Sequence, residues 1–161
     1  MQTFMPSQDF AEVAKVLDNK RLNKQALEGW QILMNLLELD PQGNHRPAKG
    51  WSNHPAVKMW KGHEVALYMY IEAMTKEWLR RGYKTTIADK ARETLNTAIR
   101  KGLIEPISTL RNFPLWIQFE EILSSHRTAL LAKNYEWYSQ FDWPEDPGYP
   151  ITEYTYIWPT K

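Results

Sequence analysis

Residues 17–39 read LDNKRLNKQALEGWQILMNLLEL, and this stretch predicts a long helix whose first half is charged and whose second half is apolar. Asp18 or Asn19 can cap its start, and turn-forming residues follow its end at positions 40–44. Glu28 stands where the charged half meets the apolar half. Because carboxylates at the edge of a buried surface often take part in catalysis, Glu28 is a candidate for chemistry.

Four further segments have apolar residues three and four positions apart, which is the period of a helix. They cover residues 7–17, 56–81, 87–100 and 114–133. Ser7, Pro55 and Pro114 stand where residues of these types open helices, and Gly82 and Gly102 stand where glycine ends them. All the strong periods along the chain are therefore helical.

The chain beyond Tyr138 differs from the rest, because large aromatic rings alternate there with four prolines. Proline interrupts helices, and so many rings are not left in a free tail, so we expect an irregular strap folded over the helices. The sequence thus predicts an all-α fold, with a single compact helical domain over residues 1–161 and an irregular, aromatic and proline-rich C-terminal strap.

The composition restricts the classes of function. The 161 residues carry a formal net charge of only +1, so binding to nucleic acid must rely on local basic clusters. There are no cysteines, and the four histidines lack the spacing of a zinc helix, so we expect neither a metal site nor a cofactor. No apolar run approaches the roughly 20 residues of a membrane span. We expect a monomer in the cytoplasm, which is the host cytoplasm if a phage encodes the protein.

One face of the predicted helix at 17–39 collects polar side chains. Arg21, Gln25 and Glu28 follow one another at spacings of four and three, so they share a stripe that can line a pocket. Lys20 and Lys24 flank this stripe and can hold the phosphates of a nucleic-acid strand. On spacing alone, the alternative is an ordinary solvated helix start in which Glu28 forms a salt bridge, and that arrangement is the more common one.

Two other groups of polar residues can contribute to the same site. His54 precedes a proline at a helix start with Lys58 close behind it, so His54 can bind a phosphate or transfer a proton, or it can simply cap the helix. His126 and Arg127 interrupt an apolar helical pattern, where polar groups face either a pocket or a buried network. They can join Glu28, or they can pair with neighbouring glutamates.

The segment from Leu17 to Glu28, with a helix that opens at His54 and closes in the residues 78–83, resembles the pyrimidine-dimer DNA glycosylase (phage endonuclease V) family. Residues 132–138, which read AKNYEWY, also resemble the segment with a Trp-Tyr pair near the C-terminal end of that family's sequences. The start at residues 1–6 and the block 51–60 are more similar to a bacterial and phage branch grouped with it. The resemblance covers most of the chain.

This resemblance implies a helical enzyme that flips a nucleotide out of duplex DNA, cleaves the N-glycosidic bond of a damaged or modified pyrimidine base, and can then nick the abasic strand. In that family the N-terminal α-amine attacks the sugar, and a helix glutamate, which Glu28 matches, supports the sugar intermediates. Because the large Gln2 opposes removal of the initiator methionine, the amine here is that of Met1. An α-amine keeps a useful unprotonated fraction near neutral pH.

We therefore predict a metal-independent DNA glycosylase with possible abasic-site lyase activity. Its predicted catalytic residues are Glu28, Met1, Arg21 and His54, and its predicted DNA contacts are Lys20, Lys24, Gln25, Lys58, His126 and Arg127. Two other classes of function stay open at this point. One is a non-catalytic nucleic-acid-binding module on the same scaffold, and the other is an N-glycosidase that acts on free nucleosides or nucleotides.

Overall fold

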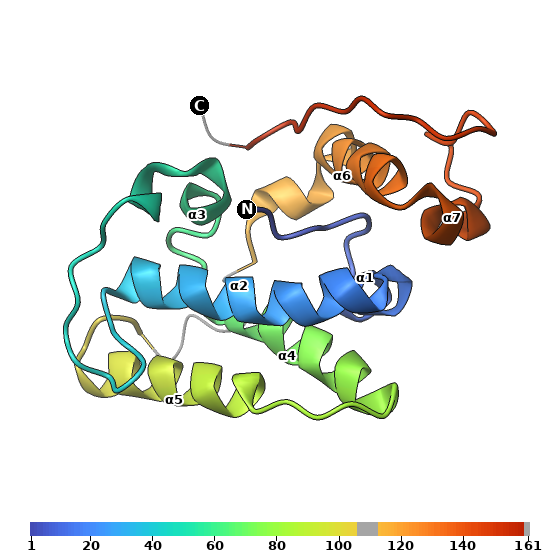
Figure 1. The fold of residues 1–161 in the computed structure, drawn as a ribbon. Coiled ribbons are helices and arrows are strands. Elements are labelled where there is room, and N and C mark those ends of the chain that lie inside the picture. The colour runs from blue at the N-terminus through green and yellow to red at the C-terminus, as the bar shows by residue number, and fades with distance from the viewer. Residues whose placement is uncertain (106–112, 160–161) are drawn as a thin grey trace.

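The computed structural model describes residues 1–105 and 113–159, and helix α2, Asn19–Leu37, lies at the centre of what it describes (Figure 1). Helix α2 packs against α4 and α5, and α4 also packs against α5 and α1. The bounds of these helices are Phe10–Val16 for α1, Glu64–Arg80 for α4 and Ile87–Arg100 for α5. Within the described residues there is no strand, only an isolated bridge between Leu39 and His45. The predicted all-α fold is confirmed.

The apolar half of α2 explains its central place. Trp30, Leu33 and Leu37 recur at three and four positions and are all buried, as are Leu22 and Ala26 in the preceding turns. Each large apolar side chain taken out of water in this way contributes about 1.5–3 kcal/mol to folding. Burial of this stripe therefore holds α2 between its neighbours.

Gly29 allows α2 to approach α4 closely. A Cβ at this position would lie 2.7 Å from Cγ1 of Ile71, a fully buried residue of α4. Two carbon atoms do not come this close in a folded protein unless their surroundings shift. Any larger side chain at position 29 would therefore push the two helices apart.

We expect Gly29→Val to lower the free energy of unfolding by roughly 2–3 kcal/mol, because it overpacks the contact between α2 and α4. Urea unfolding followed by circular dichroism measures this change. The matched control is Asn23→Val, at an exposed position of the same helix, where the expected change is about 0.5 kcal/mol or less. Equal losses in both variants would contradict the packing argument.

The structure differs from the helix predicted over 56–81. This segment divides into α3, Pro55–Lys58, which follows the 3-10 turn η1, Trp51–Asn53, and the separate helix α4. Gly62 lies between α3 and α4 with a φ of 82°, in the left-handed region that glycine adopts at little cost. The apolar period continues through the break because both helices bury their apolar faces in the same core.

The helix predicted over 114–133 also divides. A 3-10 turn, η3, covers Leu115–Gln118, and α6 then runs over Glu120–Lys133. The side chain of Asn134 caps the short helix α7, Tyr135–Tyr138, and a last 3-10 turn, η4, covers Ser139–Phe141. The start of the first helix also differs from the prediction. Asp9, rather than Ser7, caps α1, and its side chain accepts the Ala11 N–H at 2.9 Å.

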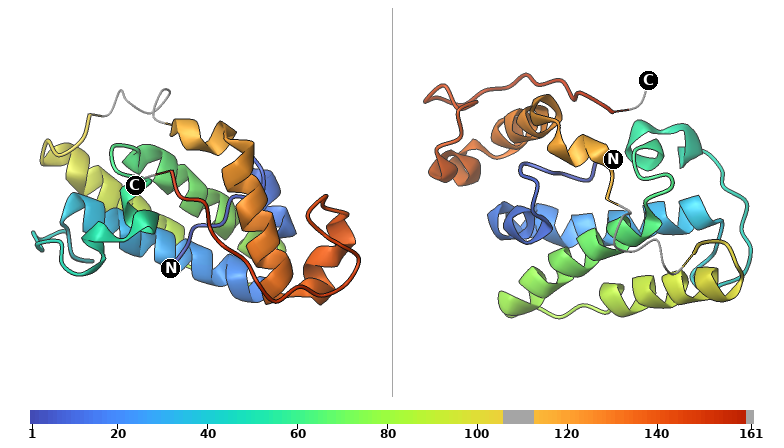
Figure 2. Two further views of the ribbon diagram at one scale, coloured as in Figure 1. Left: turned by 90° about the horizontal axis from the view of Figure 1, so that it is seen from above. Right: turned by 180° about the vertical axis from the view of Figure 1, so that it is seen from behind.

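The C-terminal strap, residues 142–159, contains no helix and crosses over the N-terminal segment of the chain (Figure 2). The ring of Tyr156 lies 6.2 Å from that of Phe4 and 5.9 Å from that of His126, measured between centroids. The N–H of Ile157 donates to Ser125 Oγ of α6 at 3.1 Å. The expected irregular strap is confirmed, and it covers residues near the N-terminus. Every helix in the described part of the chain is too short or too polar to cross a membrane.

Candidate active site

Met1, Arg21, Gln25 and Glu28 line one pocket with a volume of about 380 Å³. Helix α2 supplies the last three of these residues, and the N-terminal segment supplies Met1. The remaining lining residues are Gln2, Phe4, Lys20, Lys24, Lys133, Tyr154 and Tyr156. The stripe predicted from spacing thus forms one wall of a pocket, and the chain terminus and the C-terminal strap form the others.

Gln25 connects the N-terminal segment to Glu28. Its Nε2 donates to the backbone oxygen of Gln2 at 2.9 Å and to Glu28 Oε2 at 3.4 Å. Its Oε1 accepts the N–H of Phe4 at 2.7 Å, and the hydroxyl of Tyr70 lies 2.8 Å from both this Oε1 and the Phe4 oxygen. Gln25 and Tyr70 are both buried, so the network is shielded from water and fixes residues 2–4 beside the carboxylate.

Further hydrogen bonds hold the N-terminal segment as far as Pro6. Trp60 Nε1 donates to Thr3 Oγ1, the N–H of Met5 donates to His126 Nδ1, and Arg127 Nη1 donates to the Pro6 oxygen, each at 2.8 Å. Residues 2–5 are buried, whereas Met1 is partly exposed at the pocket. The fold therefore determines where the Met1 amine lies.

Basic side chains line part of this pocket. Lys24 Nζ lies 3.6 Å from Glu28 Oε1, and Arg21 Nη1 donates to Asp18 Oδ2 at 3.1 Å. The salt bridge considered for Glu28 is therefore present, but it does not leave the carboxylate in open solvent. The Glu28 side chain is only 13% exposed, whereas that of Lys24 is 66% exposed. Lys24 can move to a phosphate without taking Glu28 with it.

His54 lies outside the lining of the pocket but near the chain terminus. Its Nδ1 accepts the N–H of Ala56 at 3.0 Å, so His54 does cap α3. Its ring packs against that of Trp158, with the two ring centroids 5.8 Å apart. Partial burial and, next, the positive charge of the Met1 amine lower the pKa of His54 below its ordinary value. His54 is therefore neutral at pH 7 and keeps its proton on Nε2, where it can donate.

Lys58, His126 and Arg127 are not brought to the pocket. Lys58 is exposed on α3 and is not among the lining residues. His126 has no exposed surface, so the predicted DNA contact is corrected to a structural role. Arg127 is also buried, and its guanidinium binds Glu145, Glu120 and the Pro6 oxygen. Both residues form the buried network that was the alternative reading of this segment.

The burial of His126 makes the stability of the fold depend on pH. Burial and then the charge of Arg127 lower the pKa of His126 from 6.5 to about 3. The neutral ring accepts the Met5 N–H at Nδ1. The unfolded chain binds a proton near pH 6.5 and the folded chain does not. Stability is therefore full above pH 6.5 and is lost as the pH falls towards 3.

Between pH 7 and pH 5 we expect the free energy of unfolding to fall by about 2 kcal/mol from this group, at about 1.4 kcal/mol per pH unit below 6.5. Urea unfolding at the two pH values measures it. His126→Asn keeps an acceptor for the Met5 N–H but does not titrate, so it should lack this part of the loss. The same fall in both proteins would contradict the assignment.

Five lining residues were not identified as site residues from the sequence: Gln2, Phe4, Lys133, Tyr154 and Tyr156. Lys133 Nζ lies 5.1 Å from the ring centroid of Tyr154, which is 5.3 Å from the ring of Tyr156. Burial first, and then the neighbouring Tyr154, raise the pKa of Tyr156 above its ordinary value, and Glu28 adds to this effect, so Tyr156 stays protonated beside the carboxylate. The density of aromatic residues in the strap was a signal, but it did not show which rings reach the pocket.

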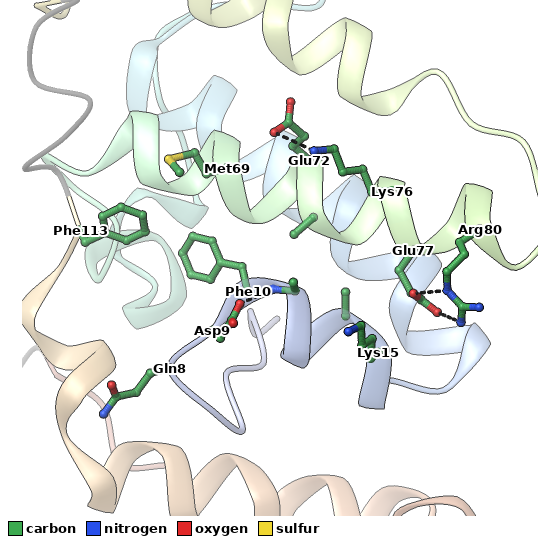
Figure 3. A pocket seen from close by; sticks show the side chains of 13 residues that line it. Gln8, Asp9, Phe10, Lys15, Met69, Glu72, Lys76, Glu77, Arg80 and Phe113 are labelled. Carbon is green, nitrogen blue, oxygen red and sulfur yellow. Dashed lines mark hydrogen bonds and ion pairs between the residues drawn. The ribbon is translucent and has the colours of Figure 1, made fainter.

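A larger cavity, of about 640 Å³, is formed by other elements (Figure 3). Phe10 of α1 and Phe113 face each other across it with ring centroids 5.6 Å apart. The carboxylates of α4 at its edge are already paired, Glu72 with Lys76 and Glu77 with Arg80. No residue predicted to be catalytic lines this cavity. In the described residues there is also no cluster of three or more His, Asp or Glu side chains placed to hold a metal ion.

A family model described as pyrimidine dimer DNA glycosylase matches residues 1–91. The chain belongs to this family. The family expected from the sequence is thus confirmed, and membership makes the protein a DNA glycosylase whose substrate is DNA. Neither the curated proteins nor the solved structures give a match.

The part of this pyrimidine dimer DNA glycosylase that matches its family includes Met1, Gln25 and Glu28. The match ends within α5, so Lys133 and the strap tyrosines of the pocket lie beyond it. One wall of the pocket is therefore shared with the family model, and the wall opposite comes from residues outside the match.

Proposed function

We propose that this protein excises a damaged or modified pyrimidine from duplex DNA in the pocket of Met1 and Glu28. The amine of Met1 acts as the nucleophile, and the carboxylate of Glu28 stabilises positive charge and transfers protons. The observation that carries the proposal is the bonding of Gln25, which holds the N-terminal segment and Glu28 against each other in one pocket.

The chemistry begins with an unprotonated amine. The Met1 nitrogen attacks C1′ of the damaged nucleotide, and the N-glycosidic bond breaks with its electron pair passing to the departing base, which takes up a proton. The new C–N bond leaves a proton on nitrogen, and the Glu28 carboxylate accepts it and passes it to O4′ as the sugar ring opens. The product of these steps is a protonated Schiff base between Met1 and C1′.

The position of Glu28 suits the charge that develops in these steps. Positive charge builds on the sugar as the base leaves, and a poorly exposed carboxylate stabilises it more strongly than one in water. Loss of a C2′ proton from the Schiff base then expels the 3′ phosphate, which is the lyase step. Water finally hydrolyses the C–N bond and restores the amine.

The surroundings of the pocket are suited to a flipped nucleotide. Lys20, Arg21 and Lys24 lie at the pocket, where they can bind the phosphates on either side of the nucleotide. Tyr154 and Tyr156 offer rings to an extruded base. The neutral His54 provides an N–H near the Met1 amine for a sugar or phosphate oxygen.

The test uses three duplexes that carry a single cyclobutane pyrimidine dimer, a single abasic site or no lesion. We expect cleavage of one N-glycosidic bond of the dimer in the first, which photoreversal of the dimer reveals as free base. We expect strand scission of the second, and a covalent protein–DNA complex with both when sodium borohydride is added. Binding without base release would favour the non-catalytic module. Turnover of free nucleosides, with little dependence on salt, would favour the alternative N-glycosidase.

A further inference from the structure

A third cavity, of about 610 Å³, lies against the same helix as Glu28. Gln31, Met34 and Asn35 of α2 form one side of it, and the loop from Arg46 to Trp51 forms the other. This loop follows the C-terminal end of α2 and leads into α3 (Figure 1). Nothing in the chemistry proposed above uses these residues.

The lining of this cavity has the features of a site for an unstacked base. Met34 is buried and provides an apolar floor, and Trp51 is 47% exposed and presents an aromatic ring. Gln31 and Asn35 provide amide groups, which can hydrogen-bond to the edge of a base. A ring to stack on and amides for the base edge are what single nucleotides require from proteins.

The charge of the same lining suits a phosphate chain. Arg46 and Lys49 are exposed, the lining contains no carboxylate, and neither cation forms an ion pair with any residue in the part of the chain described. By contrast, the exposed Arg92 and Arg100 of α5 are paired with acidic side chains. Two unpaired cations beside an exposed tryptophan therefore favour a polyanion over an acidic side chain of this protein.

This third cavity and the pocket of Glu28 lie along the same helix, α2. Gln31 and Asn35 follow Glu28 by one and two helical turns, so they share its face of the helix. The distance from Glu28 to Asn35 along the axis is about 10.5 Å, or about three steps of 3.4 Å along a DNA strand. The loop passes directly into the turn before α3, where the N–H of His54 donates to the Trp51 oxygen at 2.8 Å.

We propose that Trp51, Arg46, Lys49 and the amides of Gln31 and Asn35 form a second nucleotide-binding site, which holds the DNA strand about three nucleotides to one side of the reacting nucleotide. Trp51 stacks on an unstacked base, and Arg46 and Lys49 bind the adjoining phosphates. The proposal rests on the proposed function, because it takes the strand at Glu28 as its starting point.

The test measures binding of the full chain to a duplex with a tetrahydrofuran abasic analogue, which has no base to release. Trp51→Ala should weaken binding about tenfold, and Trp51→Phe should retain most of the wild-type affinity. Arg46→Gln and Lys49→Gln should each reduce the slope of log affinity against log salt concentration by about one. Lys76→Gln, a lysine paired with Glu72 on α4, is the control and should change neither quantity.

Shortened duplexes then locate the contact. Cutting the duplex to two base pairs on one side of the analogue should weaken wild-type binding and remove the effect of Trp51→Ala, and the same cut on the other side should leave that effect intact. An unchanged affinity of Trp51→Ala for every duplex would overturn the second site while leaving the role of Glu28 standing. Failure of the wild-type protein to bind any of the duplexes would overturn the proposed function, and this site with it.

Discussion

We expect Glu28→Gln to lower the rate of N-glycosidic bond cleavage in dimer-containing DNA by about 10³-fold. The carboxylate is the group that stabilises the positive sugar and transfers the proton to O4′, and an amide can do neither. Glutamine has the same shape and can still bond to Gln25, so the pocket should keep its form. Single-turnover assays with enzyme in excess, in which photoreversal of the dimer frees the cleaved base, measure the chemical step directly.

The control for this prediction is Glu12→Gln, which also removes one carboxylate paired with a lysine in a helix but lies on the exposed surface of α1. Its rate should equal that of the wild type. Binding of Glu28→Gln to the abasic analogue should be retained or improved, because the substitution removes a negative charge from the DNA site. Cleavage of the N-glycosidic bond by Glu28→Gln at the wild-type rate would exclude Glu28 from the chemistry.

The second large effect concerns the amine of Met1. Adding one glycine before Met1 moves the α-amine by about 3.8 Å, while the bonds that hold residues 2–6 are unchanged. Because a displacement of about 1 Å can cost 10²-fold in rate, we expect the borohydride-trapped complex to fall at least 10²-fold. Gel electrophoresis of the protein–DNA complex after reduction measures the trapped fraction.

The matched control adds the same glycine after Lys161, which leaves the N-terminus unchanged and should leave trapping unchanged. Mass spectrometry of the trapped complex should place the DNA fragment on Met1. If the N-terminal extension removes trapping but cleavage of the N-glycosidic bond continues, water activated by Glu28 is the nucleophile. If trapping persists on a lysine, the amine of Met1 has no catalytic role.

The sequence was sufficient to predict the parts of the fold that depend on neighbours along the chain. The stripe of Arg21, Gln25 and Glu28 follows from the helical period alone, and the structure places all three in one pocket. The bounds of α5 agree with the predicted 87–100, because a strong apolar period ends there at a glycine. The break at Gly62 was missed, since an apolar period does not show where a helix is interrupted.

Residues whose roles depend on distant contacts were harder to interpret. His126 and Arg127 looked equally suited to a site or to a buried network, and the distinction came from Met5 and Pro6, more than 100 positions away. The pocket residues of the strap and of the N-terminus were likewise beyond sequence patterns, because no period relates Tyr156 to Glu28.

The sequence by itself thus determined that the protein is helical, that Glu28 lies at the border of a buried helix face, and that basic groups flank it. These properties are local, since they follow from the 3.6-residue period and from the side chains within a few turns. Only the tertiary structure decided that Gln25 bonds to Gln2, Phe4 and Glu28 together and so brings the terminus to the carboxylate. Such a network forms only when helices, terminus and strap pack around one core, and hydrogen bonds between distant residues leave no period in the sequence.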